Sequence, residues 1–201
     1  AEIITAKYGY HLPIYRQQDI FAGSGWVPSR STLNNLVLRA AFVVAEFMQY
    51  MKARVQNDIC IGLDDTSCRM LLPRDEVIAV AGDLKNQRLA EKVAEAKAKK
   101  EQSLIAKMWA YQGLSDAPYN IFDFRVSRHR DGPEEFLKNS RGVVMADCYS
   151  GNTSVVLRSD ERLKFAACWA HARRKVKEAT TYTKERDTLL DMINALYDVE
   201  T

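Results

Sequence analysis

The chain has 201 residues, a net charge of +3 and 47% hydrophobic residues, which is enough apolar side chain for one or two globular domains and excludes a disordered chain. Four widely spaced cysteines are too few for a disulfide scaffold, and Arg39 and Glu46 interrupt the longest apolar stretch, so we expect no membrane-spanning helix. The sequence begins at Ala1 without an initiator methionine, so we expect a piece of a longer chain. It shows no signal-peptide pattern, so we expect a cytoplasmic protein. The small total charge by itself predicts no nucleic-acid partner.

The first third of the chain is predicted to be helical. Residues 14–25 predict a short helix closed by Gly23 and Gly25. The following segment predicts a second helix, with Ser29 as its N-cap and apolar residues at a period near 3.6. The two predicted helices and the turn between them are typical of a helix-turn-helix DNA-binding motif. An ordinary helical hairpin is the alternative, and we favour it because a helix-turn-helix demands so little of a sequence.

The middle of the chain changes from strand to helix patterning. Residues 59–63 alternate as a strand that ends on Asp64 and Asp65, and a second strand over residues 68–72 is predicted after a tight turn. Residues 74–106 then form an insertion that is mainly helical and rich in Ala, Lys and Glu. A nucleic-acid arm is one interpretation of this insertion, but a solvated helix is favoured because Glu dilutes the Lys residues.

Strand patterning returns after the insertion and ends in one or two helices from His171 onward. A short helix is expected at Pro133, which suits a helix N-terminus. The remaining strands are predicted within residues 108–113, 119–127, 141–147 and 163–170. This order predicts a mixed α/β domain over residues 57–201 behind a helical segment over residues 1–56.

Two of the predicted strands end on an acid, Asp64 in the first and Asp147 after residues 143–146. Functional groups gather where the strands of an α/β sheet end. The like-charge repulsion between two converging aspartates is relieved by a hard cation such as Mg²⁺. A pair of such ions is known to catalyse attack on a phosphodiester. The alternative is that both aspartates only begin turns, as Asp often does.

Basic residues gather at the last predicted strand-to-helix junction. The helix N-terminus and its arginines suit phosphate oxygens, whereas the alternative is a solvated basic helix face. The cluster consists of His171, Arg173, Arg174, Lys175 and Lys177. A second basic run, over residues 125–130, contains Arg128 and Arg130.

Six motifs, taken together and in this order, resemble the transposases of the insertion-sequence-66 family. They cover the chain from about Lys7 to Glu200 and read KYGYHLPIYRQQDIFAGSGWVPSRSTLNNLV, GLDDTSCRML, MWAY, GVVMADCYSGN, CWAHARRKVKEA and ALYDVE. The resemblance implies a DDE-type catalytic domain with an RNase H-like fold, a mixed sheet flanked by helices. It also implies that three acids hold two Mg²⁺ or Mn²⁺ ions.

The resemblance assigns the three acids to Asp64, Asp147 and Glu200 as catalytic residues and metal ligands. Asp65 stands where the family usually has Glu, but it is not itself the expected ligand. Glu200 is the weakest of the three because a helical Glu is a common surface residue and spacing alone does not separate it from its rivals Asp198, Glu161 and Glu178. The chain also ends one residue after Glu200, which leaves open that a fragment of this length is inactive.

The function implied by the resemblance is DNA strand cleavage at a transposon end, followed by transfer of the freed 3′-OH to target DNA. The expected DNA contacts are His171, Arg173, Arg174, Lys175, Arg128 and Arg130. The expected partners are the transposon ends, the target DNA and further copies of the chain, at the nucleoid of a bacterial cell. The alternatives are a DNA-binding module without chemistry, based on residues 14–50, and a nuclease relative that only hydrolyses DNA.

Overall fold

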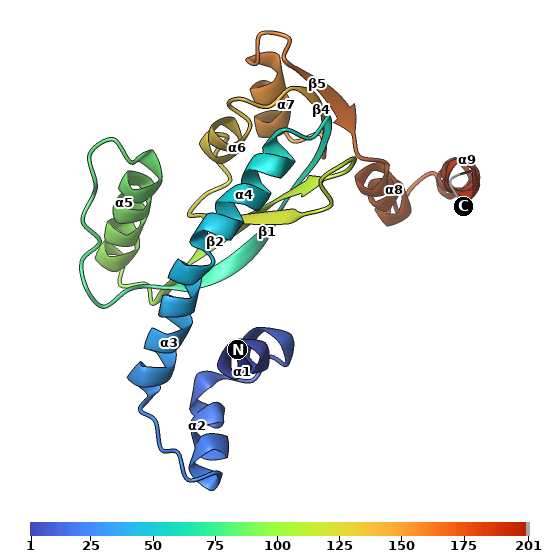
Figure 1. Cartoon of the computed structure of the whole chain (residues 1–201). Coiled ribbons are helices and arrows are strands. Elements are labelled where there is room, and N and C mark those ends of the chain that lie inside the picture. The colour runs from blue at the N-terminus through green and yellow to red at the C-terminus, as the bar shows by residue number, and fades with distance from the viewer. Residues whose placement is uncertain (200–201) are drawn as a thin grey trace. The chain divides into compact units, whose positions relative to one another are not determined.

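The protein divides into two compact units, one from Ala1 to Tyr50 and one that begins at Met51. A computed structural model describes residues 1–199 (Figure 1). The boundary between the units falls within helix α4 (Ala45–Gln56). No helix in the described part of the chain is long and apolar enough to cross a membrane.

The first unit is helical. Its elements are α1 (Glu2–Ile4), the π-helix η1 (Thr5–Gly9), α2 (Ile14–Gly23), α3 (Arg30–Val43) and the first half of α4. Helix α2 ends at Gly23, and the Ser29 side chain caps α3 by accepting a hydrogen bond from the Thr32 amide at 3.0 Å. Helices α2 and α3 contact each other, and Leu33 is fully buried. The predicted pair of helices is therefore confirmed, while its interpretation as a helix-turn-helix stays a prediction.

The second unit is built on a five-stranded mixed sheet with the order β3-β2-β1-β4-β5. Strand β1 pairs antiparallel with β2, and β2 pairs antiparallel with β3. Strand β4 lies parallel to both β1 and β5. The strands are β1 (Cys60–Leu71), β2 (Ser103–Gly113), β3 (Asn120–Arg125), β4 (Gly142–Ala146) and β5 (Leu163–Ala167). The RNase H-like mixed sheet flanked by helices that the resemblance implies is confirmed.

The hydrophobic core of this unit lies between one face of the sheet and three helices. Val55 of α4, Phe136 of α6 and Val155 of α7 contribute to this core together with Ile61 and Leu63 of β1. The remaining helices are α5, within the insertion, and α8 and α9, which follow β5 and contact each other (Figure 1). The bounds are α5 (Leu84–Ala98), α6 (Asp131–Phe136), α7 (Ser150–Leu157), α8 (Trp169–Glu178) and α9 (Thr183–Asp198).

The prediction of two short strands around Asp64 and Asp65 is wrong, because β1 runs unbroken from Cys60 to Leu71. Its pairing with β2 continues through both aspartates to the end of the strand, although β4 pairs only with residues 60–63. After Leu63, β1 continues as a two-stranded ribbon with β2 alone, in which polar residues are tolerated. The run of polar residues after Leu63 therefore does not mark a turn.

Helix α7 was not predicted, because its first residues, Ser150 to Thr153, are weak helix formers. Tertiary packing stabilises it instead. Val155 and Val156 lie in the core, and Asn152 is buried at the first turn. This unexpected helix directly follows Asp147 and contributes to its surroundings.

Candidate active site

Asp64 and Asp147 start from adjacent backbone positions on neighbouring strands. The parallel pairing of β1 with β4 ends at Leu63 opposite Ala146, and each aspartate is the next residue of its chain segment. Paired strands lie about 4.8 Å apart, so this register brings the two carboxylates to one region of the sheet. Asp147 follows the end of β4 as predicted, whereas Asp64 lies within β1.

Both carboxylate oxygens of Asp147 accept hydrogen bonds. Oδ1 accepts from Asn152 Nδ2 at 2.7 Å and from the Tyr149 amide at 3.3 Å, and Oδ2 accepts from Arg128 Nη2 at 2.8 Å. Partial burial raises the pKa of Asp147, but the hydrogen bonds from Arg128, Tyr149 and Asn152 outweigh it and lower the pKa below its ordinary value. Asp147 is therefore held as an oriented carboxylate ion at neutral pH.

Asp64 and Asp65 have opposite environments because successive side chains of a strand point to opposite faces. The Asp64 side chain is 58% exposed, whereas the Asp65 side chain is 1% exposed and follows Leu63 on the buried face. Lys107 Nζ lies 2.7 Å from Asp65 Oδ2, and Arg128 Nε pairs with Asp65 Oδ1. Only Asp64 of this pair is open to a ligand.

Arg128 links the two strands through their acids. Its guanidinium pairs with Asp65 through Nε and with Asp147 through Nη2, and it lies 4.0 Å from the centre of the Tyr149 ring. The Tyr149 hydroxyl donates to the Arg128 carbonyl at 3.4 Å. Burial lowers the pKa of Arg128, but its two carboxylate partners outweigh this effect and raise the pKa further above its ordinary value. Arg128 is thus a fixed positive charge between two acids.

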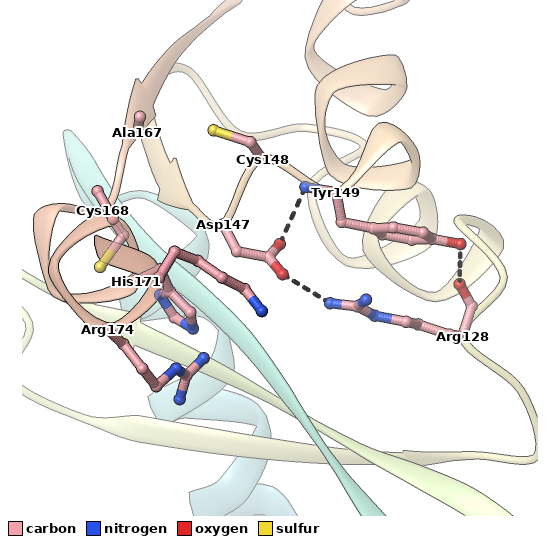
Figure 2. Close-up of a pocket in the computed structure, with 10 residues that line it drawn as sticks. Arg128, Asp147, Cys148, Tyr149, Ala167, Cys168, His171 and Arg174 are labelled. Atoms are coloured by element: carbon pink, nitrogen blue, oxygen red, sulfur yellow. Dashed lines mark hydrogen bonds and ion pairs between the residues drawn. The ribbon is translucent and has the colours of Figure 1, made fainter. Parts of the chain in front are cut away.

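A pocket of about 370 Å³ opens beside Asp147 and contains much of the predicted basic cluster. Helix α8 contributes His171, Arg174 and Lys175 to its lining. Figure 2 shows Asp147 between His171 and Arg174 on one side and Arg128 on the other. His171 Nε2 lies 3.5 Å from Asp64 Oδ2, so Asp64 lies beside a residue that lines the pocket, although it does not line the pocket itself. A pocket with cationic side chains and the Asp147 carboxylate in its wall suits a phosphate group together with a cation.

The other two predicted DNA contacts, Arg173 and Arg130, do not line this pocket. Arg173 Nε donates to Asn194 Oδ1 at 3.1 Å and so joins α8 to α9. Arg130 Nε lies 3.5 Å from Glu134 Oε1 on α6. The structure therefore brings together His171, Arg174, Lys175 and Arg128, and leaves Arg173 and Arg130 outside the pocket.

Glu200, the predicted third acid, lies outside the described residues, 1–199. Its rival Asp198 is the last residue of α9, and Glu178 is the last residue of α8. Within residues 1–199, no three carboxylate, imidazole or thiol side chains form a group that could hold a metal ion. The described residues thus supply two of the three predicted ligands, Asp64 and Asp147.

Sequence reasoning missed the residues that hold these acids in place. Asn152 belongs to a segment that was predicted as a polar loop. Lys107 stands at the end of the stretch predicted as a helix, whereas the structure places it within β2. The one available signal was that Asp65 has the spacing of Ile61 and Leu63, two positions after Leu63, which would imply a buried charge in need of cations if the strand continued. Neither cation could be named, because Lys107 and Arg128 are far from Asp65 in the sequence.

The chain has recognisable relatives among known proteins. It is similar to three uncharacterized proteins of Sinorhizobium fredii (strain NBRC 101917 / NGR234): y4jD, with 24% identity over all of this chain; y4qI, with 27% over 87% of it; and y4hP, with 23% over 92%. The chain spans 37%, 30% and 30% of the length of these relatives. No solved structure gives a significant match.

The comparison with protein families covers nearly the whole chain. The family described as Transposase IS66 family matches residues 1–79 and 90–201. The unmatched residues, 80–89, fall within the predicted insertion, at the start of α5. Both predicted acids of the sheet and the basic helix α8 lie in matched segments, and the chain belongs to the IS66 family of transposases.

Proposed function

We propose that residues 57–201 form a DDE-type catalytic core that cleaves DNA at a transposon end and joins the freed 3′-OH to target DNA, with residues 1–56 as an N-terminal helical segment. The observation that carries the proposal is the β1–β4 register, which sets the backbone positions of Asp64 and Asp147 next to each other. His171 of the basic helix α8 lies 3.5 Å from Asp64 and lines the pocket together with Asp147. Membership of a transposase family supports the same chemistry.

The donor set of the site fits a hard divalent cation. Asp64 and Asp147 offer carboxylate oxygens, which are the ligands that Mg²⁺ and Mn²⁺ prefer, and water and phosphate oxygens complete such a site. We propose Asp64, Asp147 and Glu200 as the ligands of two Mg²⁺ or Mn²⁺ ions. Two such ions, when bound, activate the attacking oxygen and stabilise the leaving oxygen.

The reaction consists of two phosphoryl transfers. In the first, a water oxygen forms a bond to the phosphorus at the transposon end, and the 3′-oxygen leaves as a 3′-OH. In the second, this 3′-OH forms a bond to a phosphorus of the target strand, and the target 3′-oxygen leaves. The carboxylates of this chain hold the ions in place, and its basic side chains bind the DNA phosphates beside them.

We propose that His171, Arg174 and Lys175 bind DNA phosphates in the pocket, and that Arg173 and Arg130 bind the DNA backbone outside it. The first three share the pocket wall that faces Asp147, which supports their contact with the reacting strand. Arg128 was also predicted to contact DNA, but its Nε and Nη2 groups are already bonded to carboxylates. It is the least suited of the six to bind a phosphate.

The double substitution of Arg174 and Lys175 by glutamine is expected to weaken DNA binding about tenfold near 0.1 M salt and to reduce the slope of log affinity against log salt by about 2, because each lost phosphate contact removes about one released counterion. Fluorescence anisotropy with a labelled duplex over a salt series measures both quantities. Lys92→Gln is the control, because Lys92 lies on α5 and pairs with Glu95 at 2.7 Å. An equal loss in the Lys92 variant would instead favour the insertion helix as a DNA-binding arm.

The proposed reaction is tested with a labelled duplex that carries the end of the mobile element encoding the chain. Incubation with target plasmid and Mg²⁺ is expected to join the labelled 3′ end to the plasmid. Cleavage without joining would support the hydrolase alternative. DNA binding with neither cleavage nor joining, in a full-length protein that contains this chain, would support a DNA-binding module without chemistry.

A further inference from the structure

The buried acid Asp65 has no place in the proposed chemistry, yet it is the most deeply enclosed carboxylate of the site. A buried carboxylate is tolerated only when cations and hydrogen bonds compensate its charge. Asp65 receives this compensation from Lys107 and Arg128. Its position is therefore that of an anchor for cationic side chains, and one of the two, Arg128, also reaches Asp147.

Arg128 has a geometry that a lysine could not reproduce. A guanidinium presents donors in a rigid planar fork, which allows it to bond two carboxylates at once and to stack on an aromatic ring. Arg128 does all of this with Asp65, Asp147 and Tyr149. Its side chain remains 33% exposed on the pocket side, so a small ion can reach the position of the guanidinium from solvent.

The bond from Arg128 completes the orientation of Asp147. A carboxylate offers about four lone-pair sites. Among the described residues, Asn152, the Tyr149 amide and Arg128 donate to three of them. Asn152 and Tyr149 hold only Oδ1, so without Arg128 the carboxylate could turn about its Cβ–Cγ bond. With Arg128 in place, one direction is left open for a ligand.

The segment that carries Arg128 is itself fastened by the insertion helix α5. Lys85 Nζ lies 2.6 Å from Asp123 Oδ1, before Arg128 in the chain. Arg88 pairs with Asp131, after it, and Arg88 Nη2 lies 3.3 Å from Nδ1 of the adjacent His129. Ion pairs on both sides of Arg128 limit the movement of its backbone.

We propose that Arg128 is a positioning residue: anchored on Asp65 and Tyr149, it fixes the Asp147 carboxylate in the orientation that binds the divalent cation. The inference rests on the proposed function, because it requires Asp147 to be a metal ligand. A positioning role for Arg128 differs from a purely Coulombic role, because a positive charge beside a metal site by itself weakens cation binding. Positioning and charge therefore predict effects of opposite sign.

The first experiment compares the Mn²⁺ affinity of the whole chain with that of Arg128→Lys by isothermal titration calorimetry. The substitution keeps the charge but loses the fork, and partners that orient metal ligands typically change metal affinity 10–100-fold, so we expect Kd for Mn²⁺ to rise about tenfold or more. Arg125→Lys is the matched control, because Arg125 also bridges two carboxylates, Asp123 at 2.6 Å and Glu135 at 2.9 Å, away from the pocket. Its Kd is expected to stay at the wild-type value.

The second measurement removes the side chain and restores its chemistry. Arg128→Ala is expected to regain Mn²⁺ affinity when millimolar guanidinium is added, because the free ion can occupy the vacated site between Asp65 and Asp147. Arg125→Ala is not expected to respond. Tightening of metal binding by an added cation contradicts a Coulombic role and supports positioning, whereas a further weakening would overturn the inference.

The outcomes separate the inference from the proposed function through a third variant, Asp147→Asn. The role of Arg128 alone would be overturned by three results together. The wild-type protein binds Mn²⁺, Asp147→Asn no longer binds it, and Arg128→Lys binds it with unchanged affinity. Wild-type protein that binds no Mn²⁺, or binds it equally well as Asp147→Asn, would overturn the proposed function and the role of Arg128 with it. Thermal unfolding of each variant confirms that the compared proteins are folded.

Discussion

Replacing Asp64 with asparagine is expected to reduce Mg²⁺-dependent DNA cleavage by about 10³-fold or more, equivalent to about 4 kcal/mol of transition-state stabilisation. Asparagine keeps the size of the side chain but loses the charge and one of the two oxygens that we propose as ligands of the cation. The free energy of unfolding is expected to change by no more than about 0.5 kcal/mol, because the Asp64 side chain is mostly exposed. At Asp64 we therefore expect a large loss of cleavage activity without a comparable loss of folding stability.

Nicking of supercoiled plasmid, with Mg²⁺ or Mn²⁺ as the added ion, measures the change in activity for Asp64. Asp160→Asn serves as the control, because Asp160 is an exposed loop residue outside the pocket, and its positive φ of 50° is a conformation that asparagine also adopts. Nicking by Asp64→Asn at the wild-type rate would remove Asp64 from the catalytic set.

Asp65→Ala, unlike Asp64→Asn, is expected to destabilise the protein, lowering the free energy of unfolding by about 3 kcal/mol, as is typical when one partner of a buried ion pair is removed. The substitution leaves Lys107 and Arg128 without their shared carboxylate. Both side chains are partly exposed, 21% and 33%, so water compensates some of their charge and the loss falls at the lower end of the usual range. Their mutual repulsion remains.

Urea unfolding monitored by tryptophan fluorescence measures this change, because Trp109 lies opposite Asp65 on β2 and is fully buried. Asp64→Ala is the matched control, one residue away on the other face of the same strand, and is expected to unfold at nearly the wild-type urea concentration. Equal midpoints for the two variants would mean that Asp65 is not the anchor that its burial indicates.

The sequence predicts the architecture well where local patterns and packing agree. The alternating residues before Asp64, the apolar run before Asp147 and the capped helix after Ser29 all appear in the structure as expected. The prediction was wrong at the polar residues after Leu63. There, pairing with β2 maintains a strand that composition alone suggests is a turn. Helix α7 was missed for the related reason that packing, and not propensity, forms it.

The candidate site, like the fold, could be predicted from the sequence only in part. The acids Asp64 and Asp147 follow from motif and strand patterning, since both belong to short stretches of contiguous sequence. The bridge through Arg128 could not be predicted, because it joins residues 63 and 19 positions apart in the chain. Its formation depends on the order of strands in the sheet, which brings β1 next to β4. The basic run around Arg128 indicated phosphate binding, whereas the fold supplies carboxylates as partners.

The central claim, that Asp64 and Asp147 share a divalent cation, is tested most directly by anomalous scattering from crystals of the chain soaked in Mn²⁺. We expect an anomalous peak about 2.0–2.2 Å from a carboxylate oxygen of each aspartate, beside the pocket formed by α8. The peak should vanish in Asp147→Asn crystals soaked in the same way. A saturating soak with no peak between the two aspartates, or with a peak that persists in Asp147→Asn, would contradict the assignment of this sheet as a metal-dependent catalytic core.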